Sequence, residues 1–553
     1  MILGTSTIFI LFLIPFPVHL AHLASGDMEG RNHVDRINRC VFVVGCGVPA
    51  LVTAVIVIHQ LTRTSALAGV SAYDDGVYFG AAVRLVNGEL PYLDYVFVHP
   101  PGSTLAFAPL ALVSTIVGTG NAFALARIAM AGVVVANVGL VSWFVRRHGI
   151  LAMIGAGLVL ACFPLSVSAT HTMTLEPLLV LLSLSGLAAM FDANGQARCG
   201  PATRRAGLLL GLACLVKLWA MLVLVPVLVV CLVSPGRRRE CRSLIAGSAA
   251  GFGIVMVFFL LLDPVAVVQN VIGAQIGRSS SSVWGFTVAE RLVLLTGIGD
   301  FPNPVLARRA VIVAATFVVV VAAIWWMGRD HLRVGEWCLA ATAMITVHAV
   351  LLVPADFYRY YTYFPVSLVA PICGITLGLA QRRVSGGASG AGQRAIRMAR
   401  GVTLSMGVLM AGAAFAVLRT AVPYIEEYLA PSRNSSALIE RLIPSGACVI
   451  FDEPAPSLLA DRFPVGLDDC PRLVDPFAVF LAENGGRTDA TTEPFDATFV
   501  AAWSGWLSHA DYVVLVSPRS SFVPWTPELE AQFADTFQLV GSADRTFVYR
   551  RRG

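Results

Sequence analysis

Long apolar runs separated by short polar segments dominate the hydrophobic pattern of the chain. Most of the runs are close to the length that an α-helix needs to cross about 30 Å of hydrocarbon. The pattern predicts a polytopic α-helical membrane protein with about eleven spans. We expect the spans at 40–61, 121–145, 149–168, 177–191, 206–233 (two short legs), 243–262, 307–327, 336–353, 361–380 and 401–418.

Composition supports a membrane protein. Of 553 residues, 56% are hydrophobic and only 13% are charged, whereas soluble proteins carry about 25% charged residues. The net charge of +5 is modest. Arginines gather in short loops, as in the cytoplasmic loops of membrane proteins, and do not form a nucleic-acid-binding patch. We therefore expect a multi-pass protein of the cell membrane, in contact with membrane lipid and without a nucleic-acid partner.

The arginine-rich loops also predict a topology. A single span over 206–233 would place Arg204 and Arg205 on the opposite side from the arginines at 237–239. A hairpin that turns near Lys217 keeps both clusters in the cytoplasm and spares the lysine from burial at mid-membrane. The same rule gives a cytoplasmic N-terminus and an extracytoplasmic C-terminal domain.

The N-terminal 39 residues have two interpretations. Residues 1–24 are apolar and resemble a signal peptide, but no basic residue precedes the apolar run as one normally would. Alternatively, Met28 is the true start and opens a polar cytoplasmic tail before the first span. We favour Met28.

Residues 40–419 form the expected membrane domain, with outer loops at 62–120 and 263–305. Proline residues interrupt the first loop, which we expect to form two helices along the membrane surface, at 72–88 and 101–117.

Residues 420–553 have the composition of a soluble domain. Apolar segments at 448–451 and 512–516 predict buried strands, Pro527 marks a helix start, and 537–550 predicts a pair of strands. A small extracytoplasmic α/β domain follows. Cys448 and Cys470, the two cysteines of this segment, either form a disulfide or remain two buried thiols.

Two adjacent carboxylates, Asp74 and Asp75, stand in the first surface helix among apolar and aromatic residues. Consecutive helical residues point about 100° apart, so we expect only one of them to face a reaction cavity. By contrast, Arg84, Glu89 and Asp94 are expected to be solvated flanks. The predicted topology brings further polar residues to the same outer face: His99, His171, Glu176, Lys217, Arg278, Asp356 and Arg359.

These groups suit sugar transfer from a polyprenyl phosphate. The apolar chain of such a donor stays in the bilayer, so the reaction must occur at the membrane surface. A carboxylate would remove the proton of the acceptor hydroxyl, and cationic side chains would bind the leaving phosphate.

The segment Tyr73-Asp74-Asp75-Gly76-Val77-Tyr78-Phe79-Gly80 resembles the acidic first-loop motif of GT-C glycosyltransferases, which include protein O-mannosyltransferases, aminoarabinose transferases of lipid A, and actinobacterial arabinosyl- and mannosyltransferases. Four further segments resemble motifs of that superfamily in the same order: 92–102 with His99-Pro100-Pro101, 174–177 with Glu176-Pro177, 211–217 ending in Lys217, and 359–365 beginning with Arg359. The chain departs from the motifs at Asp75, where Glu is commoner, at Val216 and Leu218, and at His99, where some relatives carry Lys.

The resemblance implies a role for each matched residue. Asp74 would be the catalytic base and Asp75 would support the acceptor or share that role. His99, Lys217 and Arg359 would contact the lipid phosphate, and Glu176 would orient a sugar hydroxyl or a cation. Arg278 is a further substrate-binding candidate at the same face. Some relatives use a divalent metal, but the first loop has no Asp-x-Asp motif, and we predict no cofactor.

The expected reaction transfers a pentose or hexose, such as arabinose or mannose, to a cell-envelope glycan, glycolipid or protein. Two alternatives are a transporter or flippase of lipid-linked sugars and a non-catalytic GT-C-like subunit. A transporter would carry its polar groups at mid-membrane and within repeats, whereas here they lie at one face and no repeat is visible.

Overall fold

The computed structural model describes residues 32–62, 66–70, 72–192, 194–233, 238–276, 286–297, 304–354, 357–386, 435–484 and 497–553. The N-terminal 31 residues, Arg278, Asp356 and the expected span at 401–418 lie outside these ranges. Within them, six helices are long and apolar enough to cross a membrane. They are α3 (Asn32–Leu61), α6 (Thr119–Phe144), α12 (Arg238–Leu262), α16 (Pro304–Gly328), α17 (Val334–Leu352) and α18 (Tyr363–Gly386).

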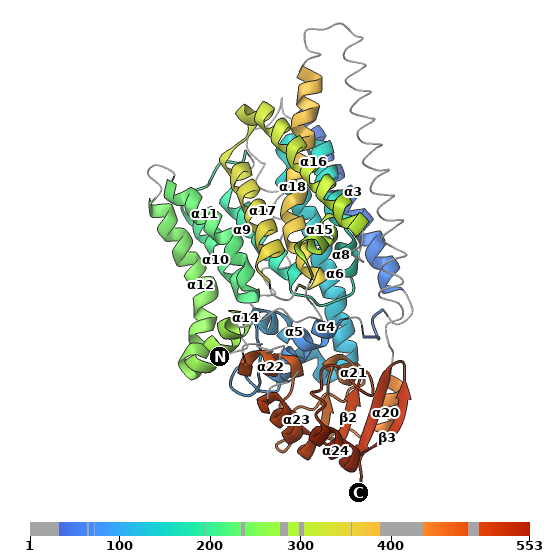
Figure 1. Cartoon of the computed structure of the whole chain (residues 1–553). Coiled ribbons are helices and arrows are strands. Elements are labelled where there is room, and N and C mark those ends of the chain that lie inside the picture. The colour runs from blue at the N-terminus through green and yellow to red at the C-terminus, as the bar shows by residue number, and fades with distance from the viewer. Residues whose placement is uncertain are drawn as a thin grey trace.

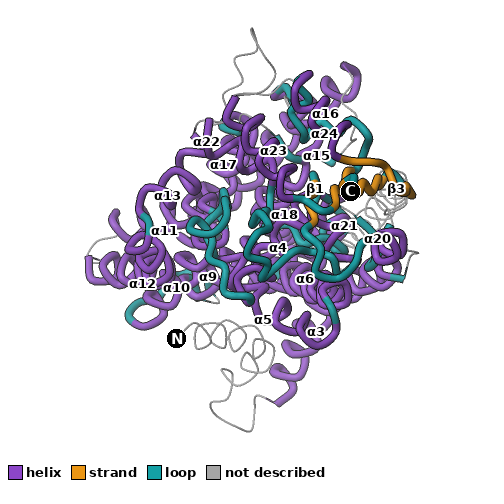
Figure 2. The backbone as a smooth tube through the Cα atoms, turned by 90° about the horizontal axis from the view of Figure 1, so that it is seen from below, coloured by secondary structure: helices purple, strands orange, loops and turns teal. Residues whose placement is uncertain are grey.

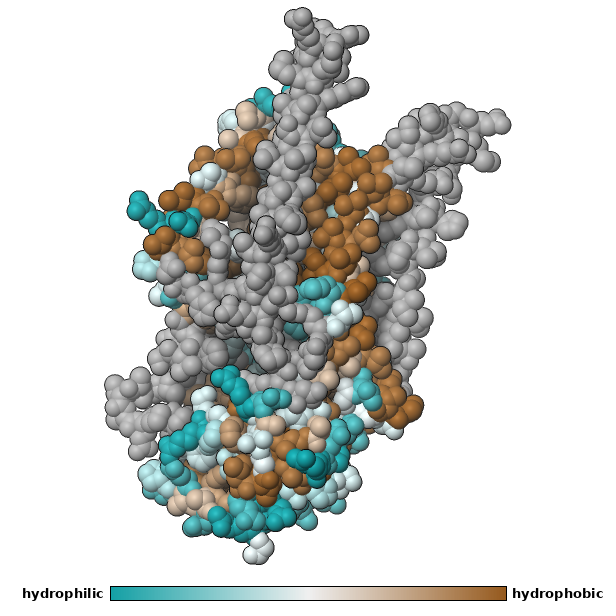
Figure 3. Space-filling view, turned by 90° about the vertical axis from the view of Figure 1, so that its right-hand side faces the viewer, coloured by the Kyte–Doolittle hydropathy of each residue, from teal (hydrophilic) through white to brown (hydrophobic). Residues whose placement is uncertain are grey.

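Shorter helices complete the helical bundle shown in the upper part of Figure 1: α7 (Ile150–Ala161), α8 (Pro164–Ser168), α9 (Glu176–Met190), α10 (Pro201–Val216) and α11 (Met221–Val233). Hydrophobic residues predominate on the visible face of the bundle, and hydrophilic residues on the C-terminal domain below it (Figure 3). The chain is therefore a polytopic α-helical membrane protein with a C-terminal domain at one end of the bundle.

Helices α10 and α11 form the expected hairpin. Gly207 of α10 lies against Leu244 of α12, and Gly211 lies against Ser248, so the two helices run parallel. The intervening α11 must then run the other way. The turn is at Lys217, whose extended backbone (φ −156°, ψ 131°) ends α10. Arg204 and the start of α12 consequently lie at the same end of the bundle.

The parallel contact between α10 and α12 depends on small residues. Gly207 and Gly211 on α10 face Gly247 and Gly251 on α12, and a Cβ atom added at any of the four would approach a backbone oxygen of the other helix to 2.2–2.3 Å. Such GxxxG pairs let two helix backbones approach closely within a membrane. Figure 2 shows α10 between α9 and α12.

Residues 263–305, expected as an outer loop, contain helices for which no prediction was made. The described part contains α13 (Pro264–Val268), a π-helical turn η4 (Gln269–Gly273), α14 (Ala274–Ile276) and α15 (Val288–Thr296). The side chain of Asp263 caps α13, and Thr287 with Glu290 forms a capping box at α15. These capping groups satisfy the first N–H groups of the two helices and define where each of them begins.

The two surface helices occur as expected, as α4 (Tyr73–Val86) and α5 (Gly102–Val117). Both lie between the bundle and the C-terminal domain (Figure 1). The site residues on α4 are therefore enclosed between the two parts of the protein.

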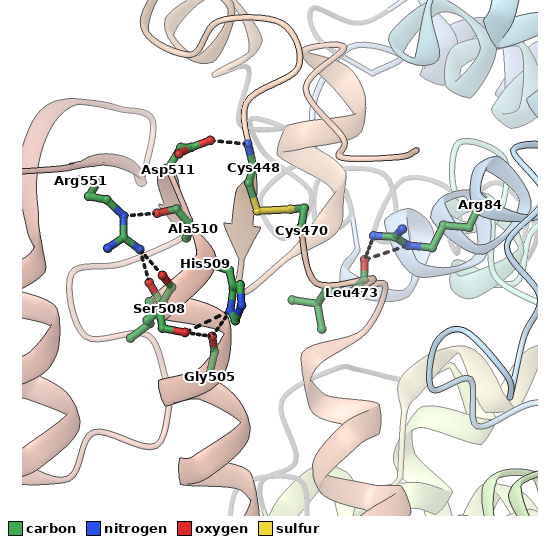
Figure 4. Close-up of a disulfide and its surroundings, with 11 residues drawn as sticks. Arg84, Cys448, Cys470, Leu473, Gly505, Ser508, His509, Ala510, Asp511 and Arg551 are labelled. Atoms are coloured by element: carbon green, nitrogen blue, oxygen red, sulfur yellow. Dashed lines mark hydrogen bonds between the residues drawn. A yellow bond between two sulfur atoms is a disulfide. The ribbon is translucent and has the colours of Figure 1, made fainter. Parts of the chain in front are cut away.

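The C-terminal domain contains a four-stranded sheet in the order β1-β2-β4-β3. Strands β1 (Val449–Phe451) and β2 (Tyr512–Leu515) pair in parallel, and β4 (Thr546–Arg551) pairs antiparallel with both β2 and β3 (Phe537–Ala543). The helices are α20 (Ser436–Leu442), α21 (Pro454–Leu459), α22 (Pro476–Asn484), α23 (Ala497–His509) and α24 (Pro527–Thr536). Cys448 and Cys470 form a disulfide with a Cα–Cα distance of 5.4 Å (Figure 4).

We predict that Gly247→Leu destabilises the bundle, because the new side chain would collide with the backbone oxygen of Arg204. Overpacking of this kind costs about 1–3 kcal/mol. Gly253→Leu, on the same helix, is the control because a Cβ atom there meets nothing within 4 Å. Thermal unfolding in detergent should show a lower Tm for the first variant only; equal Tm values would contradict the close contact.

Candidate functional site

One side of helix α4 lies directly on the C-terminal domain. A Cβ atom at Gly76 would lie 2.5 Å from the backbone nitrogen of Ala455 in α21, and one at Gly80 would lie 3.2 Å from the ring of Phe463. Only a residue without a side chain allows the backbone of α4 to approach α21 this closely. Packing thus explains Gly76, and Gly80 leaves room for the ring of Phe463.

The far end of α4 is fixed by Arg84. Its Nη2 donates to the carbonyl oxygen of Leu473 at 2.8 Å (Figure 4), and its guanidinium also pairs with Glu89. Arg84 is 1% exposed and Glu89 is 7% exposed. The expectation that they are solvated flanks is therefore wrong, because the C-terminal domain covers them. Asp94 remains partly exposed and pairs with Arg472 of the same domain.

The near end of α4 is held by Tyr73. Its hydroxyl donates to Asp475 Oδ1 at 2.6 Å, and its ring stacks on Phe522 with centroids 4.7 Å apart. Burial, followed by the Asp475 carboxylate, raises the pKa of Tyr73 well above its usual range. The phenol therefore stays protonated and donates its hydrogen bond at neutral pH.

The two acids of the motif point to different partners. Asp75 is fully buried; its Oδ2 accepts from Arg127 Nε at 3.0 Å, and its Oδ1 accepts from the backbone N–H of Met173 at 2.6 Å. Burial raises the pKa of Asp75, while Arg127 and the Met173 amide oppose that shift. All of these contacts are internal, so Asp75 is part of the framework beside the site.

Asp74 faces a group of aromatic hydroxyls. Its Oδ2 accepts hydrogen bonds from Tyr78 at 3.4 Å and from Tyr360 of η6 (Arg359–Thr362). Tyr78 lies 3.5 Å from His99 Nε2. Burial and the Asp74 carboxylate raise the pKa of Tyr78 well above its usual range, so it too stays a donor. Asp74, Tyr78, His99 and Tyr360 form one connected cluster.

An ion pair adjoins this cluster. Lys217 Nζ lies 2.6 Å from Glu176 Oε1, and both side chains are buried. The same ammonium group lies 4.1 Å from the ring centroid of Tyr361, next to Tyr360. The second carboxylate oxygen of Glu176 is buried without a hydrogen-bond partner among the described residues, which leaves a free acceptor next to Lys217.

The structure thus brings together Asp74, His99, Glu176 and Lys217 from four separate segments. Arg359 begins η6, directly before Tyr360, whereas Asp75 points away and Arg278 lies outside the described residues. The loop before His99 is fixed by the segment that follows the membrane helix α12: Asn270 accepts from the Phe97 amide at 3.3 Å, and Gln275 donates to the Val98 carbonyl at 2.8 Å.

Sequence reasoning missed four residues at the site: Tyr78, Arg127, Tyr360 and Asp475. Arg127 did leave a signal, because a lone arginine in an apolar run must have a partner. Tyr78 and Tyr360 lie within the quoted motifs, but their side-chain directions depend on the fold. No sequence feature indicates that Asp475 contacts Tyr73, 402 positions away. In the described part of the chain, no group of three or more His, Cys, Asp or Glu side chains is arranged to hold a metal ion.

Comparison with known proteins gives the fold and the class. Residues 97–354 match the model of Glycosyltransferase family 87. The crystal structure of ArnT from Cupriavidus metallidurans bound to undecaprenyl phosphate aligns with a TM-score of 0.56 at 15% identity, over 94% of this chain and 98% of that chain. The chain is a glycosyltransferase that shares the fold of ArnT.

The apo form of the same ArnT aligns with this glycosyltransferase with a TM-score of 0.55 at 15% identity, over 91% of this chain and 97% of that one. No curated protein sequence matches the chain. The family match favours sugar transfer over the alternative of a lipid-linked sugar transporter.

We predict that Lys217→Met destabilises this glycosyltransferase by about 3–5 kcal/mol, because it leaves the buried Glu176 carboxylate without its counter-charge. The double variant Lys217→Met/Glu176→Gln removes both charges and should recover most of the loss. Thermal unfolding in detergent tests this. A Lys217→Met protein as stable as wild type would show that the two side chains do not form a buried ion pair.

Proposed function

We propose that this glycosyltransferase transfers a sugar from a polyprenyl-phosphate donor to a cell-envelope glycan, glycolipid or protein at the extracytoplasmic membrane surface, with Asp74 as the general base. The observation that carries the proposal is the cluster of Asp74, Tyr78, His99 and Tyr360 beside the Lys217–Glu176 pair. Undecaprenyl phosphate bound to the similar ArnT supports a donor of the same lipid class.

Asp74 is suited to act as the base because its carboxylate faces the cluster, whereas the Asp75 carboxylate is bound to Arg127 and the Met173 amide. Removing the acceptor's proton lets the hydroxyl oxygen form a bond to the anomeric carbon as the bond to the phosphate oxygen breaks. Tyr78 and Tyr360 orient the carboxylate through hydrogen bonds. We assign Asp75 a supporting role.

Basic side chains on the segments that meet at the cluster suit the leaving phosphate. His99, Lys217 and Arg359 are the proposed phosphate ligands, because charge-assisted hydrogen bonds to phosphate are the strong ones. The free carboxylate oxygen of Glu176, next to Lys217, can accept a hydrogen bond from a sugar hydroxyl. The C-terminal domain covers α4 from the other side and helps to exclude water from the site. Arabinose and mannose are the proposed sugars, and Arg278 remains a candidate ligand.

The extracytoplasmic position of the site is part of the proposal. The Cys448–Cys470 disulfide supports it, because such bonds persist in oxidising compartments. The arginine-rich turns lie at the other end of the bundle, as expected for the cytoplasmic side.

We predict that Asp74→Asn lowers kcat by about 100-fold or more, because general-base catalysis contributes about 10²–10⁴-fold. The assay follows radiolabelled polyprenyl-phosphate arabinose and polyprenyl-phosphate mannose, with envelope glycolipids as acceptors, in proteoliposomes. Asp330→Asn, an exposed carboxylate at the other end of the bundle, is the control. Wild-type rates for Asp74→Asn would refute the assigned base.

We predict that a membrane-impermeant maleimide labels two cysteines, one on each side of the membrane, under different conditions. Cys199 is exposed in the turn between α9 and α10 and should react only after the membrane is opened. An added Ser542→Cys, exposed on β3, should react in intact cells. Labelling of Cys199 in intact cells would overturn the proposed orientation.

A further inference from the structure

Arg127 stands out among the buried charged groups that the proposed reaction does not use. It lies in the first third of α6, its side chain is 0% exposed, and its guanidinium lies 4.2 Å from the ring centroid of Phe123. A fully buried arginine is costly unless every N–H finds a partner. Its partners therefore show what the residue holds in place.

The hydrogen bonds of Arg127 reach two segments. Nη1 donates to the carbonyl oxygens of Leu67 and Gly69, at 2.9 and 2.8 Å, in the segment that precedes α4. Nε and Nη2 both donate to Oδ2 of Asp75 within α4. One side chain thus fixes both the entry to α4 and its first turn, where Asp74 stands.

Asp75 extends the connection to a third segment. Its other oxygen accepts from the Met173 amide at 2.6 Å. Met173 is three residues before Glu176, the partner of Lys217. The chain of contacts therefore runs from Arg127 through Asp75 to both halves of the site: Asp74 on one side, and the Glu176–Lys217 pair on the other.

We propose that Arg127 is a positioning residue for sugar transfer, which acts through Asp75 to hold Asp74 and the Glu176 segment at their working separation. The proposal rests on the proposed function of Asp74. This role explains why residue 75 is acidic although it does not contact the substrate. One carboxylate oxygen accepts from the guanidinium and the other accepts from the Met173 amide. A displacement of about 1 Å at a reacting group can cost about 100-fold in rate.

The test separates positioning from mere stability. Arg127→Gln leaves the Asp75 charge buried and unpaired, so both Tm and kcat should fall. The double variant Asp75→Asn/Arg127→Gln removes both charges and keeps an acceptor for the Met173 amide, so Tm should recover. The two neutral amides cannot replace the guanidinium hydrogen bonds that join Leu67 and Gly69 to α4. We therefore expect kcat to stay about 10- to 100-fold below wild type, with a smaller change in the KM for the donor.

Glu336→Gln is the matched control. Glu336 is the buried partner of Arg147 and His148 at the other end of α17 from η6, so it should lower Tm while leaving kcat unchanged. The assay is the proteoliposome transfer of radiolabelled polyprenyl-phosphate arabinose and mannose, normalised to folded protein. If Arg127→Gln does not accumulate as folded protein, the double variant and Arg127→Lys carry the test.

The outcomes distinguish this inference from the function on which it rests. Recovery of kcat together with Tm in the double variant would show a structural role and overturn the inference. Loss of transfer in Asp74→Asn, with wild-type kcat in the Arg127 variants, would overturn the inference alone. Wild-type transfer in Asp74→Asn would overturn both. A low kcat with a recovered Tm, beside an inactive Asp74→Asn, supports the positioning role.

Discussion

Helix α4 has to be buried on both sides while carrying two carboxylates, and the rest of the structure accommodates that constraint. A buried charge needs a partner and hydrogen bonds. Asp75 receives both from the bundle, through Arg127 and the Met173 amide. On the opposite side, Gly76 and Gly80 let the C-terminal domain approach the helix backbone. Only Asp74 is left to face the aromatic and cationic groups of the proposed site.

The C-terminal domain is therefore part of the site's construction. A short segment of this domain accepts hydrogen bonds from both ends of α4. The Leu473 carbonyl accepts from Arg84, and the Asp475 carboxylate accepts from Tyr73. The same domain caps α6, because Asp461 accepts from the backbone N–H of Gly120 at 3.1 Å and from the Thr119 hydroxyl at 2.8 Å. Helix α6 carries Arg127, so the domain supports both partners of the ion pair beside Asp74.

Much of the membrane architecture could be predicted because it depends on local properties of the sequence. Apolar length and loop arginines predict the spans, and the position of Lys217 predicts the hairpin. Helical geometry indicates that one of two adjacent acids faces the site, and the family resemblance assigns that position to Asp74. The ion pair between Asp75 and Arg127 supplies the physical reason, which the sequence does not show. Arg84 and Glu89 were expected in solvent because their burial depends on a domain almost 400 residues later in the chain. The helices within 263–305 were missed because capping by single side chains has a weak sequence signal.

We propose that sugar transfer occurs where α4, η6 and the α10–α11 turn meet. The most direct measurement is an experimental structure of this glycosyltransferase with undecaprenyl phosphate bound in a lipid nanodisc. We expect the phosphate group within hydrogen-bonding distance of His99, Lys217 or Arg359, on the same side of α4 as the Asp74 carboxylate. A phosphate bound instead at the other end of the bundle, near Arg146 and Arg147, would contradict it.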